Sequence, residues 1–499
     1  MTAGAGTMAA PGGMLQKVRQ AVIWRSGSQI VAQAIAWGST FLVIRLLDPS
    51  DYGLFAMTQV VLVLLNVMNG YGMASALIRA ETVTPRQLSQ VLGLLLLLNG
   101  ALAAAQFATA PWVAAYYRQP MVADLLRVQS LLYLATPFLA LPHAVLSRRM
   151  DFKRPAQIRL IAALAGAATA LGCAYAGLGV WTLVAAPMAL FAVEAIGMTW
   201  AAGGPIRPSF QFAGTWSLAR FGGTMTLVQF FWFMQSQADV FIAGRMLDPH
   251  RLGLYTTAVF LTQLIASKFV PPLNEVAFAA YSRMQGETAA TGAAFVKTVR
   301  LVLLVTLPAY AGLAVVADPF VATVLGGKWS GVADILPVLT LAMAMLTLQI
   351  LFAPATNALN RPSIALRVSI AGGIVLPTAF LVGIAWDVEG LAWAWVGGMA
   401  VLLLITATLS LPAIQVAPRT LAEAALPIAI VAGGMALLVT AIDGMLPIMP
   451  AALRLTILAA VGLAAYPALL AIIAPGRLWE AWELALYRET DALEGQLAA

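Results

Sequence analysis

The sequence is poor in the residue types that disulfide-bonded and metal-dependent proteins require. Among 499 residues it has one cysteine, Cys173, and two histidines, His143 and His250. A single cysteine cannot form an intrachain disulfide, and these three residues cannot complete a typical four-ligand zinc site. We therefore expect no disulfide, no metal centre and no cofactor.

Charged residues are also scarce. They make up 10% of the chain, whereas a soluble domain carries about 25%. Hydrophobic residues make up 61%, and the mean hydropathy is +0.88. Such a chain cannot cover itself with a water-compatible surface, and no hydrophilic stretch is long enough for a separate folded domain. The composition therefore predicts a protein that crosses a membrane many times.

Motifs for hydrolytic chemistry are absent from the sequence. Gly326-Gly-Lys-Trp329 lacks the first glycine and the final hydroxyl residue of a nucleotide-binding P-loop. No His-Glu-x-x-His or Gly-x-Ser-x-Gly motif occurs either. We therefore expect that the chain is not an enzyme and that an ion gradient, substrate supply or a partner provides any energy it needs.

Long apolar runs recur along the chain and predict an all-α integral membrane protein with about 14 transmembrane helices. A polar, proline-bearing stretch near 203–212 separates two sets of six runs. The predicted spans are Ile23–Leu47, Leu54–Leu77, Leu88–Ala110, Leu125–Leu146, Ile158–Ala176, Trp181–Trp200, Leu218–Met246, Leu254–Leu273, Thr298–Val316, Ile335–Ala355, Ser369–Trp386, Leu391–Pro412, Leu421–Ile442 and Leu453–Ala474.

Basic residues predict the orientation of these spans. The net charge is +7, but the basic residues lie in short connectors, which favours the positive-inside rule over nucleic-acid binding. If the N-terminus is cytoplasmic, about three quarters of the Lys and Arg residues fall inside. The strongest cluster is Arg148–Arg154. We expect both termini in the cytoplasm, with residues 476–499 forming an amphipathic cytoplasmic tail.

An internal repeat divides the chain. Arg45-Leu-Leu-Asp-Pro-Ser-Asp-Tyr-Gly-Leu54 recurs 200 residues later as Arg245-Met-Leu-Asp-Pro-His-Arg-Leu-Gly-Leu254. An even number of spans separates the copies, so the two halves have the same orientation, as in a parallel repeat. The predicted parts are a tail (1–22), an N-lobe (23–203), a C-lobe (204–414), two further helices (415–475) and the second tail (476–499).

The repeated segment contains six residues that favour tight turns: Asp48, Pro49, Gly53, Asp248, Pro249 and Gly253. Proline is suited to the first turn of a helix, and Asp and Gly are typical of turns. We interpret the motif mainly as a helix–turn–helix device, with a gate contact as the functional alternative.

Basic residues at the ends of predicted spans are candidates for a cationic cavity. Arg25 begins the first span and Arg220 the seventh, and Arg159 and Lys268 lie on neighbouring spans. Arginine binds phosphate through a planar, two-pronged group, so these residues could hold a diphosphate. The alternative is that their side chains extend to the membrane surface with no binding role.

Acidic residues inside spans are candidates for ion coupling. Asp239 is the strongest, because it lies in the most polar predicted helix, and Glu194 and Glu275 are weaker. A carboxylate in a bilayer requires a partner, a bound cation or a proton. The alternative for all three is a contact that packs helices together.

The ordered motifs resemble the polysaccharide (Wzx-like) flippase branch of the multidrug/oligosaccharidyl-lipid/polysaccharide exporter superfamily. The resemblance is in Arg45–Phe55, the basic Arg148–Arg154 loop and Gln237-Ala-Asp-Val-Phe-Ile-Ala-Gly-Arg-Met-Leu-Asp-Pro249, which precedes Tyr255. It extends over nearly all of the chain after the first 20 or so residues.

This resemblance implies two lobes around a V-shaped central cavity in the inner membrane of a bacterium. It implies a flippase that moves polyprenyl-diphosphate-linked oligosaccharide to the periplasmic leaflet for lipopolysaccharide or exopolysaccharide synthesis. Membrane lipid, a glycan polymerase and a chain-length regulator are the other candidate partners. An ion-coupled drug or metabolite antiporter with the same architecture is the main alternative. A membrane glycan polymerase and a structural scaffold are alternatives of other classes.

Overall fold

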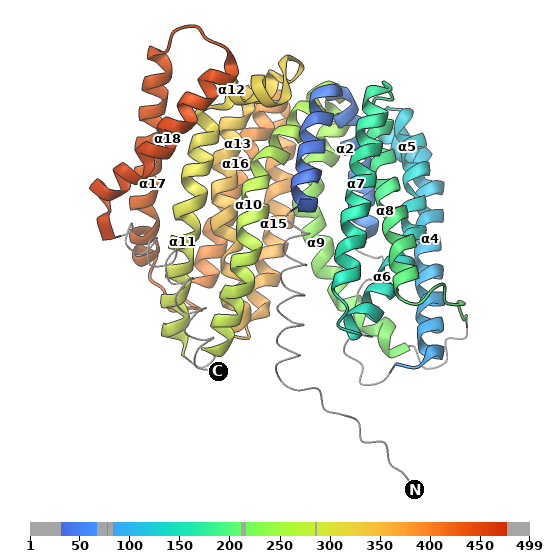
Figure 1. The fold of residues 1–499 in the computed structure, drawn as a ribbon. Helices are drawn as coiled ribbons and strands as arrows, with labels where there is room; N and C mark the ends of the chain where they lie inside the picture. The colour runs from blue at the N-terminus through green and yellow to red at the C-terminus, as the bar shows by residue number, and fades with distance from the viewer. Residues whose placement is uncertain (1–30, 67–76, 78–82, 211–215, 285–286, 477–499) are drawn as a thin grey trace. The chain divides into compact units, whose positions relative to one another are not determined.

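The chain folds into a set of long helices (Figure 1). The computed structural model describes residues 31–66, 77, 83–210, 216–284 and 287–476, and it describes side chains for these residues except 216–230. All regular elements within these residues are helical. The predicted all-α fold is therefore confirmed.

The chain divides into two compact units, Met1–Phe230 (unit 1) and Phe231–Ala499 (unit 2). The division falls inside helix α9 (Trp216–Met246). The boundary expected from the sequence, between residues 203 and 204, precedes this helix and stays a prediction, as do the other domain limits.

Unit 1 is built from neighbouring helices that pack side by side. Helix α7 packs along α8, and α6 contacts both α4 and α8. Leu92, Leu95, Leu141 and Ala144 form a buried cluster. The described helices of this unit are Val31–Leu46, α2 (Pro49–Asn66), α4 (Pro85–Tyr117), α5 (Met121–Gln129), α6 (Leu131–Arg148), α7 (Lys153–Tyr175), α8 (Trp181–Ala201) and the first part of α9.

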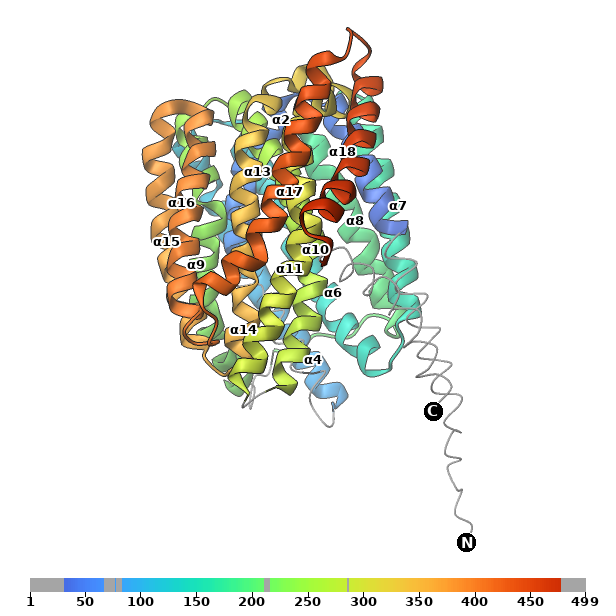
Figure 2. The ribbon, with the colours of Figure 1, turned by 90° about the vertical axis from the view of Figure 1, so that its left-hand side faces the viewer.

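Unit 2 has a larger core centred on α11, where Phe295 and Phe352 pack with ring centroids 4.9 Å apart. Helix α15 pairs with α16 along its length, as Figure 2 shows. Its elements are the rest of α9, α10 (Pro249–Arg283), α11 (Thr288–Val315), α12 (Ala317–Phe320), the π-helix η1 (Val321–Leu325), the 3₁₀ helices η2 (Gly327–Trp329) and η3 (Ile384–Trp386), α13 (Gly331–Ile350), α14 (Phe352–Ala358), α15 (Pro362–Gly383), α16 (Asp387–Ser410), α17 (Pro418–Met445) and α18 (Ala451–Ile473).

The helices are suited to a bilayer. Among the described residues, nine helical segments are long and apolar enough to cross a membrane. Several expose most of that apolar surface: only 17% of the apolar window of α7, and 17% of that of α18, is buried. When neighbouring short segments are joined, the helices follow the order of the 14 predicted spans. The chain is therefore a multi-pass membrane protein.

The repeat found in the sequence is also present in the helix boundaries. The helix Val31–Leu46 ends at residue 46 and α2 begins at Pro49, whereas α9 ends at Met246 and α10 begins at Pro249. Later in each half lies a 28-residue span, Met121–Arg148 and Gly331–Ala358, that is divided into two helices, near its start in the first half and near its end in the second. The order of the spans therefore recurs after 200 residues or slightly more, whereas the point of division within this span does not.

Some helices are longer than their apolar runs indicate. Helix α4 has 33 residues, against the predicted span Leu88–Ala110. Its start is fixed by a capping box, in which Thr84 Oγ1 accepts from Gln87 N and Gln87 Oε1 accepts from Thr84 N. Hydropathy detects only the apolar part of such a helix, so it misses ends that are set by capping.

Candidate functional site

The turn motif forms two helix starts. In the second copy, Asp248 caps α10 by accepting a 3.1 Å hydrogen bond from the backbone N–H of Arg251, and Pro249 occupies the first turn. In the first copy, the backbone N–H of Asp48 donates to Asp51 Oδ2 at 3.1 Å, and Pro49 begins α2. Gly53 and Gly253 are both buried in these first turns. The geometry supports the structural interpretation of the motif.

The most distinctive polar feature lies inside unit 2, where three side chains from three helices form one network. Tyr255 Oη of α10 donates to Asp239 Oδ2 of α9 at 2.8 Å. Trp395 Nε1 of α16 donates to Tyr255 Oη at 2.7 Å. Asp239, Tyr255 and Trp395 are 2%, 0% and 3% exposed. The buried carboxylate therefore has a donor, as its depth in the protein requires.

This network gives a structural reason for the spacing between Asp239 and Tyr255 in the sequence motif. Asp239 and Tyr255 are the ends of the Asp-x-x-x-x-Gly-Arg … Gly-x-Tyr pattern, and the structure joins them by a hydrogen bond across the turn. Asp239 lies seven residues before the end of α9, about 10 Å along the helix. The third member, Trp395, is far along the chain, and sequence reasoning missed it because nothing in an apolar helix indicates which tryptophan has a polar partner.

The two copies of the repeat differ at this position. Counting 200 residues back from Asp239 and Tyr255 gives Ser39 and Phe55. Ser39 Oγ donates to the carbonyl of Ala36 in its own helix, at 2.9 Å. Phenylalanine has no hydroxyl. The first copy therefore has neither the carboxylate nor its tyrosine donor, and this pair is a specialisation of unit 2.

A second polar contact joins α10 to α16 nearer the helix ends. Arg251 pairs with Asp387, the first residue of α16, and also lies 3.5 Å from Asp248. Arg251 and Tyr255 are four residues apart, and Asp387 and Trp395 are eight apart, so each pair lies on one face of its helix. The ion pair and the Trp395–Tyr255 hydrogen bond thus connect the same two faces at two depths.

Helix α9 also contacts α15 in unit 2 through a polar side chain. Gln235 Nε2 donates to the carbonyl of Ser369 at 3.1 Å. The amide occupies space that the absence of a side chain at Gly372 leaves open, because a Cβ there would lie 2.1 Å from Gln235 Nε2. The side chains that surround Asp239 therefore link α9 to α10, α15 and α16.

In unit 1, two of the predicted site residues pair with each other. Arg159 Nε of α7 lies 3.2 Å from Glu194 Oε1 of α8. Arg159 is 53% exposed, and Glu194 is 17% exposed. The sequence suggested a substrate contact for the first and an ion-coupling role for the second. The structure shows that each is the other's partner.

The structure describes the side chains of only two of the remaining candidates for substrate binding and ion coupling. Lys268 and Glu275 lie on exposed positions of α10. Arg25 lies outside the described residues, and the side chain of Arg220 lies outside the described side chains. The candidate cationic cavity therefore stays a prediction for these two arginines.

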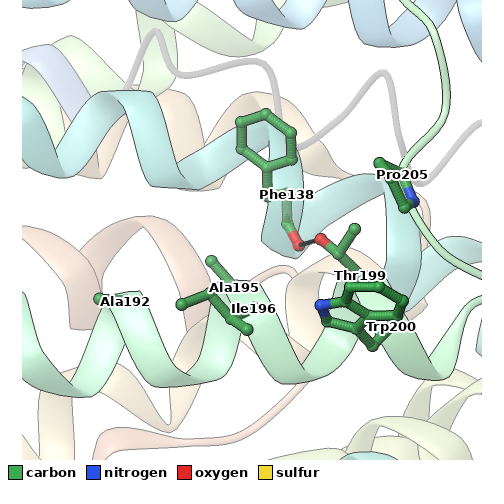
Figure 3. A pocket seen from close by; sticks show the side chains of 7 residues that line it. All are labelled: Phe138, Ala192, Ala195, Ile196, Thr199, Trp200 and Pro205. Carbon is green, nitrogen blue, oxygen red and sulfur yellow. Dashed lines mark hydrogen bonds between the residues drawn. The ribbon is translucent and has the colours of Figure 1, made fainter.

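One cavity of about 300 Å³ lies in unit 1 between α6 and α8 (Figure 3). Phe138, Ile196 and Trp200 contribute to its wall, and Thr199 Oγ1 donates to the carbonyl of Phe138 at 3.4 Å. Among the side chains that the structure describes, no Arg or Lys lines this cavity. Its lining suits hydrocarbon and gives a diphosphate no counter-charge.

The fold and its buried polar contacts define a class: a helical multi-pass membrane protein built on a repeat of six spans with two added helices. Residues 42–334 match the family described as polysaccharide biosynthesis protein. This match covers more than half of the chain. The chain therefore belongs to that family, and its predicted resemblance is confirmed.

Curated relatives agree with the family. The chain is 22% identical to "Lipopolysaccharide biosynthesis protein WzxC" of Escherichia coli (strain K12), over 63% of this chain and 65% of the relative. It is 23% identical to "Succinoglycan biosynthesis transport protein ExoT" of Rhizobium meliloti (strain 1021), over 64% of this chain and 66% of the relative. The match thus spans slightly less than two thirds of each relative.

The fold is similar to that of a solved transporter. "Lipid II flippase MurJ, inward closed conformation" superposes with a TM-score of 0.73 and 12% identity, covering 90% of this chain and 98% of that chain. At this identity the likeness shows the fold. It extends beyond the family match to nearly all of the helices.

Proposed function

We propose that this chain is a flippase in the bacterial inner membrane. It translocates polyprenyl-diphosphate-linked oligosaccharide repeat units from the cytoplasmic to the periplasmic leaflet, for lipopolysaccharide or exopolysaccharide synthesis. The observation that supports this most is the combination of a polysaccharide biosynthesis family match with the fold of a lipid II flippase over 90% of the chain. The names of WzxC and ExoT support the same process.

The parallel repeat supports alternating access as the mechanism. Two halves with the same orientation can rock about a shared axis and expose a site first to one side and then to the other. Both termini are cytoplasmic in this proposal, as the distribution of basic residues predicts. A glycan polymerase and a chain-length regulator would act on the translocated product.

Arg25 and Arg220 are the proposed contacts for the diphosphate, because each begins the first span of its half. Arg159 is a weaker candidate, because Glu194 already neutralises much of its charge. Substitution of Arg25 and Arg220 together by alanine tests the assignment. Normal export in this double variant, with normal membrane levels, would show that neither arginine holds the substrate.

Asp239 is the proposed coupling residue. A coupling cation or proton would share the carboxylate with its two donors, the Tyr255 hydroxyl on Oδ2 and the backbone N–H of Val240 on Oδ1. Glu194 and Glu275 are less suited, since Glu194 is paired with Arg159 and Glu275 is exposed on α10.

The decisive experiment measures where lipid-linked oligosaccharide accumulates when the gene is deleted in its native host. Complete repeat units retained in the cytoplasmic leaflet, with polymer lost outside, are expected. Normal export would exclude this flippase role and favour drug or metabolite antiport. Repeat units that reach the periplasmic leaflet but stay unpolymerised would instead indicate a polymerase or scaffold.

A further inference from the structure

A cavity of about 560 Å³ lies beside the turn that joins α15 to α16 in unit 2. Its wall includes Trp386, Glu389 and Trp393, together with Thr378 and Gly397. Helix α15 has 22 residues and is about 33 Å long, which matches the hydrocarbon thickness of a bilayer. The turn and the cavity therefore lie at a membrane–water boundary.

The two tryptophans and the carboxylate border the cavity from the turn and from α16. Glu389 and Trp393 are four residues apart on α16, which places them on one face of that helix, and Trp386 ends the 3₁₀ helix η3 just before it. Trp386 is 68% exposed and Trp393 is 60% exposed. At Gly397, one turn further along, a Cβ would meet nothing within 4 Å. This face of the helix is therefore open.

The neighbouring face of α16 is closed. A Cβ at Gly390 would lie 2.0 Å from the carbonyl oxygen of Gly383, and one at Gly398 would lie 2.8 Å from Leu376 Cδ2. Close backbone contact between small residues is typical of packed membrane helices. Gly383, Gly390 and Gly398 also border the cavity, so it lies along the tightly packed boundary between α15 and α16, next to the exposed tryptophans.

The acidic residues at the start of α16 have different surroundings. Asp387 pairs with Arg251 of α10. Glu389 is two residues later, about 200° around the helix, and it borders the cavity. In the described part of the chain no basic side chain pairs with Glu389. The cavity thus presents, next to apolar surface, a carboxylate in the first turn of α16 that has no basic side chain paired with it among the described residues.

We propose that this cavity binds a phospholipid whose headgroup carries an ammonium group, such as phosphatidylethanolamine. The ammonium pairs with Glu389 and lies against the faces of Trp386 and Trp393, because tryptophan attracts cations over its ring. An acyl chain lies along the apolar wall towards Gly397. Tryptophans are common at membrane boundaries, but that preference does not account for a carboxylate without a basic partner.

The negative charge of Glu389 should make the cavity prefer this lipid over the proposed substrate. Glu389 repels an anionic headgroup such as phosphatidylglycerol and also repels a diphosphate. The site is therefore expected to be distinct from the one that holds the translocated oligosaccharide lipid, and lipid binding can be measured without transport.

Native mass spectrometry of the purified full chain tests the proposal. The protein is exchanged from nanodiscs containing equal amounts of phosphatidylethanolamine and phosphatidylglycerol, and the retained lipids are counted. We expect at least a fivefold preference for phosphatidylethanolamine in the unchanged protein. Both Glu389→Gln and Trp393→Ala should reduce that preference to less than twofold. Trp112→Ala removes a tryptophan of α4 that is 72% exposed, and it should leave the preference unchanged.

Glu389→Gln changes one exposed side chain and keeps its size, so this variant should fold normally. A change in its lipid preference can therefore be attributed to the lost charge. Equal retention of the two lipids by the unchanged protein would overturn the proposal. Full preference for phosphatidylethanolamine in both variants would also overturn it. Displacement of phosphatidylethanolamine by polyprenyl-diphosphate-linked oligosaccharide, dependent on Glu389, would assign the cavity to the substrate instead.

Discussion

Asp239 and Tyr255, sixteen positions apart on consecutive helices, share a 2.8 Å hydrogen bond inside unit 2. Their counterparts 200 residues earlier are Ser39 and Phe55, which cannot make this bond. The two halves thus keep the same turn but differ in the chemistry beside it. Burying a carboxylate in a membrane costs free energy, and such residues are commonly functional. Because only the second copy of the repeat has the carboxylate at this position, unit 2 is the candidate site of ion coupling.

Tyr255→Phe should destabilise the protein by about 1–3 kcal/mol, because it leaves Asp239 without its buried hydroxyl donor and Trp395 Nε1 without an acceptor. Thermal unfolding in detergent measures the loss. Tyr466→Phe is a matched control, since its hydroxyl donates to the carbonyl of Leu304, at 2.9 Å, and to no other group in the described part of the chain. An equal effect of the two substitutions would show that the network adds nothing beyond an ordinary hydrogen bond.

Asp239→Asn removes the charge and one of the two acceptor oxygens. The Tyr255 hydroxyl donates to Oδ2 and the backbone N–H of Val240 donates to Oδ1, so one of these donors loses its acceptor and the free energy of unfolding should fall by about 1–3 kcal/mol. If Asp239 couples transport to an ion gradient, flipping in proteoliposomes should lose its response to an imposed proton or sodium gradient. A gradient response equal to that of the unchanged protein would restrict Asp239 to a packing role.

Exchange of Arg159 and Glu194 tests whether their pairing or their individual charges matter. The Arg159→Glu, Glu194→Arg double variant restores the pair across α7 and α8. We expect it to recover most of the export lost in either single variant, with a stability effect below about 1 kcal/mol because Arg159 is half-exposed. If export in the double variant stays at the level of Arg159→Glu alone, a positive charge at position 159 is needed for substrate.

Gly390→Ala should destabilise the α15–α16 hairpin by roughly 1–3 kcal/mol, because the new Cβ would collide with the carbonyl of Gly383. The matched control is Gly397→Ala on the same helix, where a Cβ meets nothing within 4 Å. Thermal unfolding and resistance to proteolysis of both variants measure the effect. If Gly390→Ala and Gly397→Ala are equally stable, α15 and α16 can move apart with little loss of free energy.

The sequence predicted the helical class, the order of the spans and the repeat, because each depends on periodic or repeated local patterns. The helix ends at Leu46 and Met246 and the starts at Pro49 and Pro249 follow from the turn chemistry of the repeated motif. The connector between the predicted spans Thr298–Val316 and Ile335–Ala355 was not predicted to contain regular structure. It contains three short helices, including a π-helix, and the fully buried Trp329, whose position depends on tertiary packing.

Side-chain partners were much harder to predict. Asp239 was identified from its depth in an apolar helix, but Trp395 is 156 positions later and hydropathy does not connect the two. The Arg159–Glu194 pair shows the same limit, since charge and depth gave each residue a separate role. Pairing depends on which helices are neighbours, and the apolar pattern of a span does not specify that.

The close contact between Gly383 and Gly390 also bears on biogenesis. These residues are seven positions apart, so the entropy lost in closing the loop between them is small. Contacts this local form early, and residues 362–410 leave the ribosome before α17 and α18. The hairpin can therefore enter the bilayer as a preassembled pair, against which the last two helices are added during synthesis.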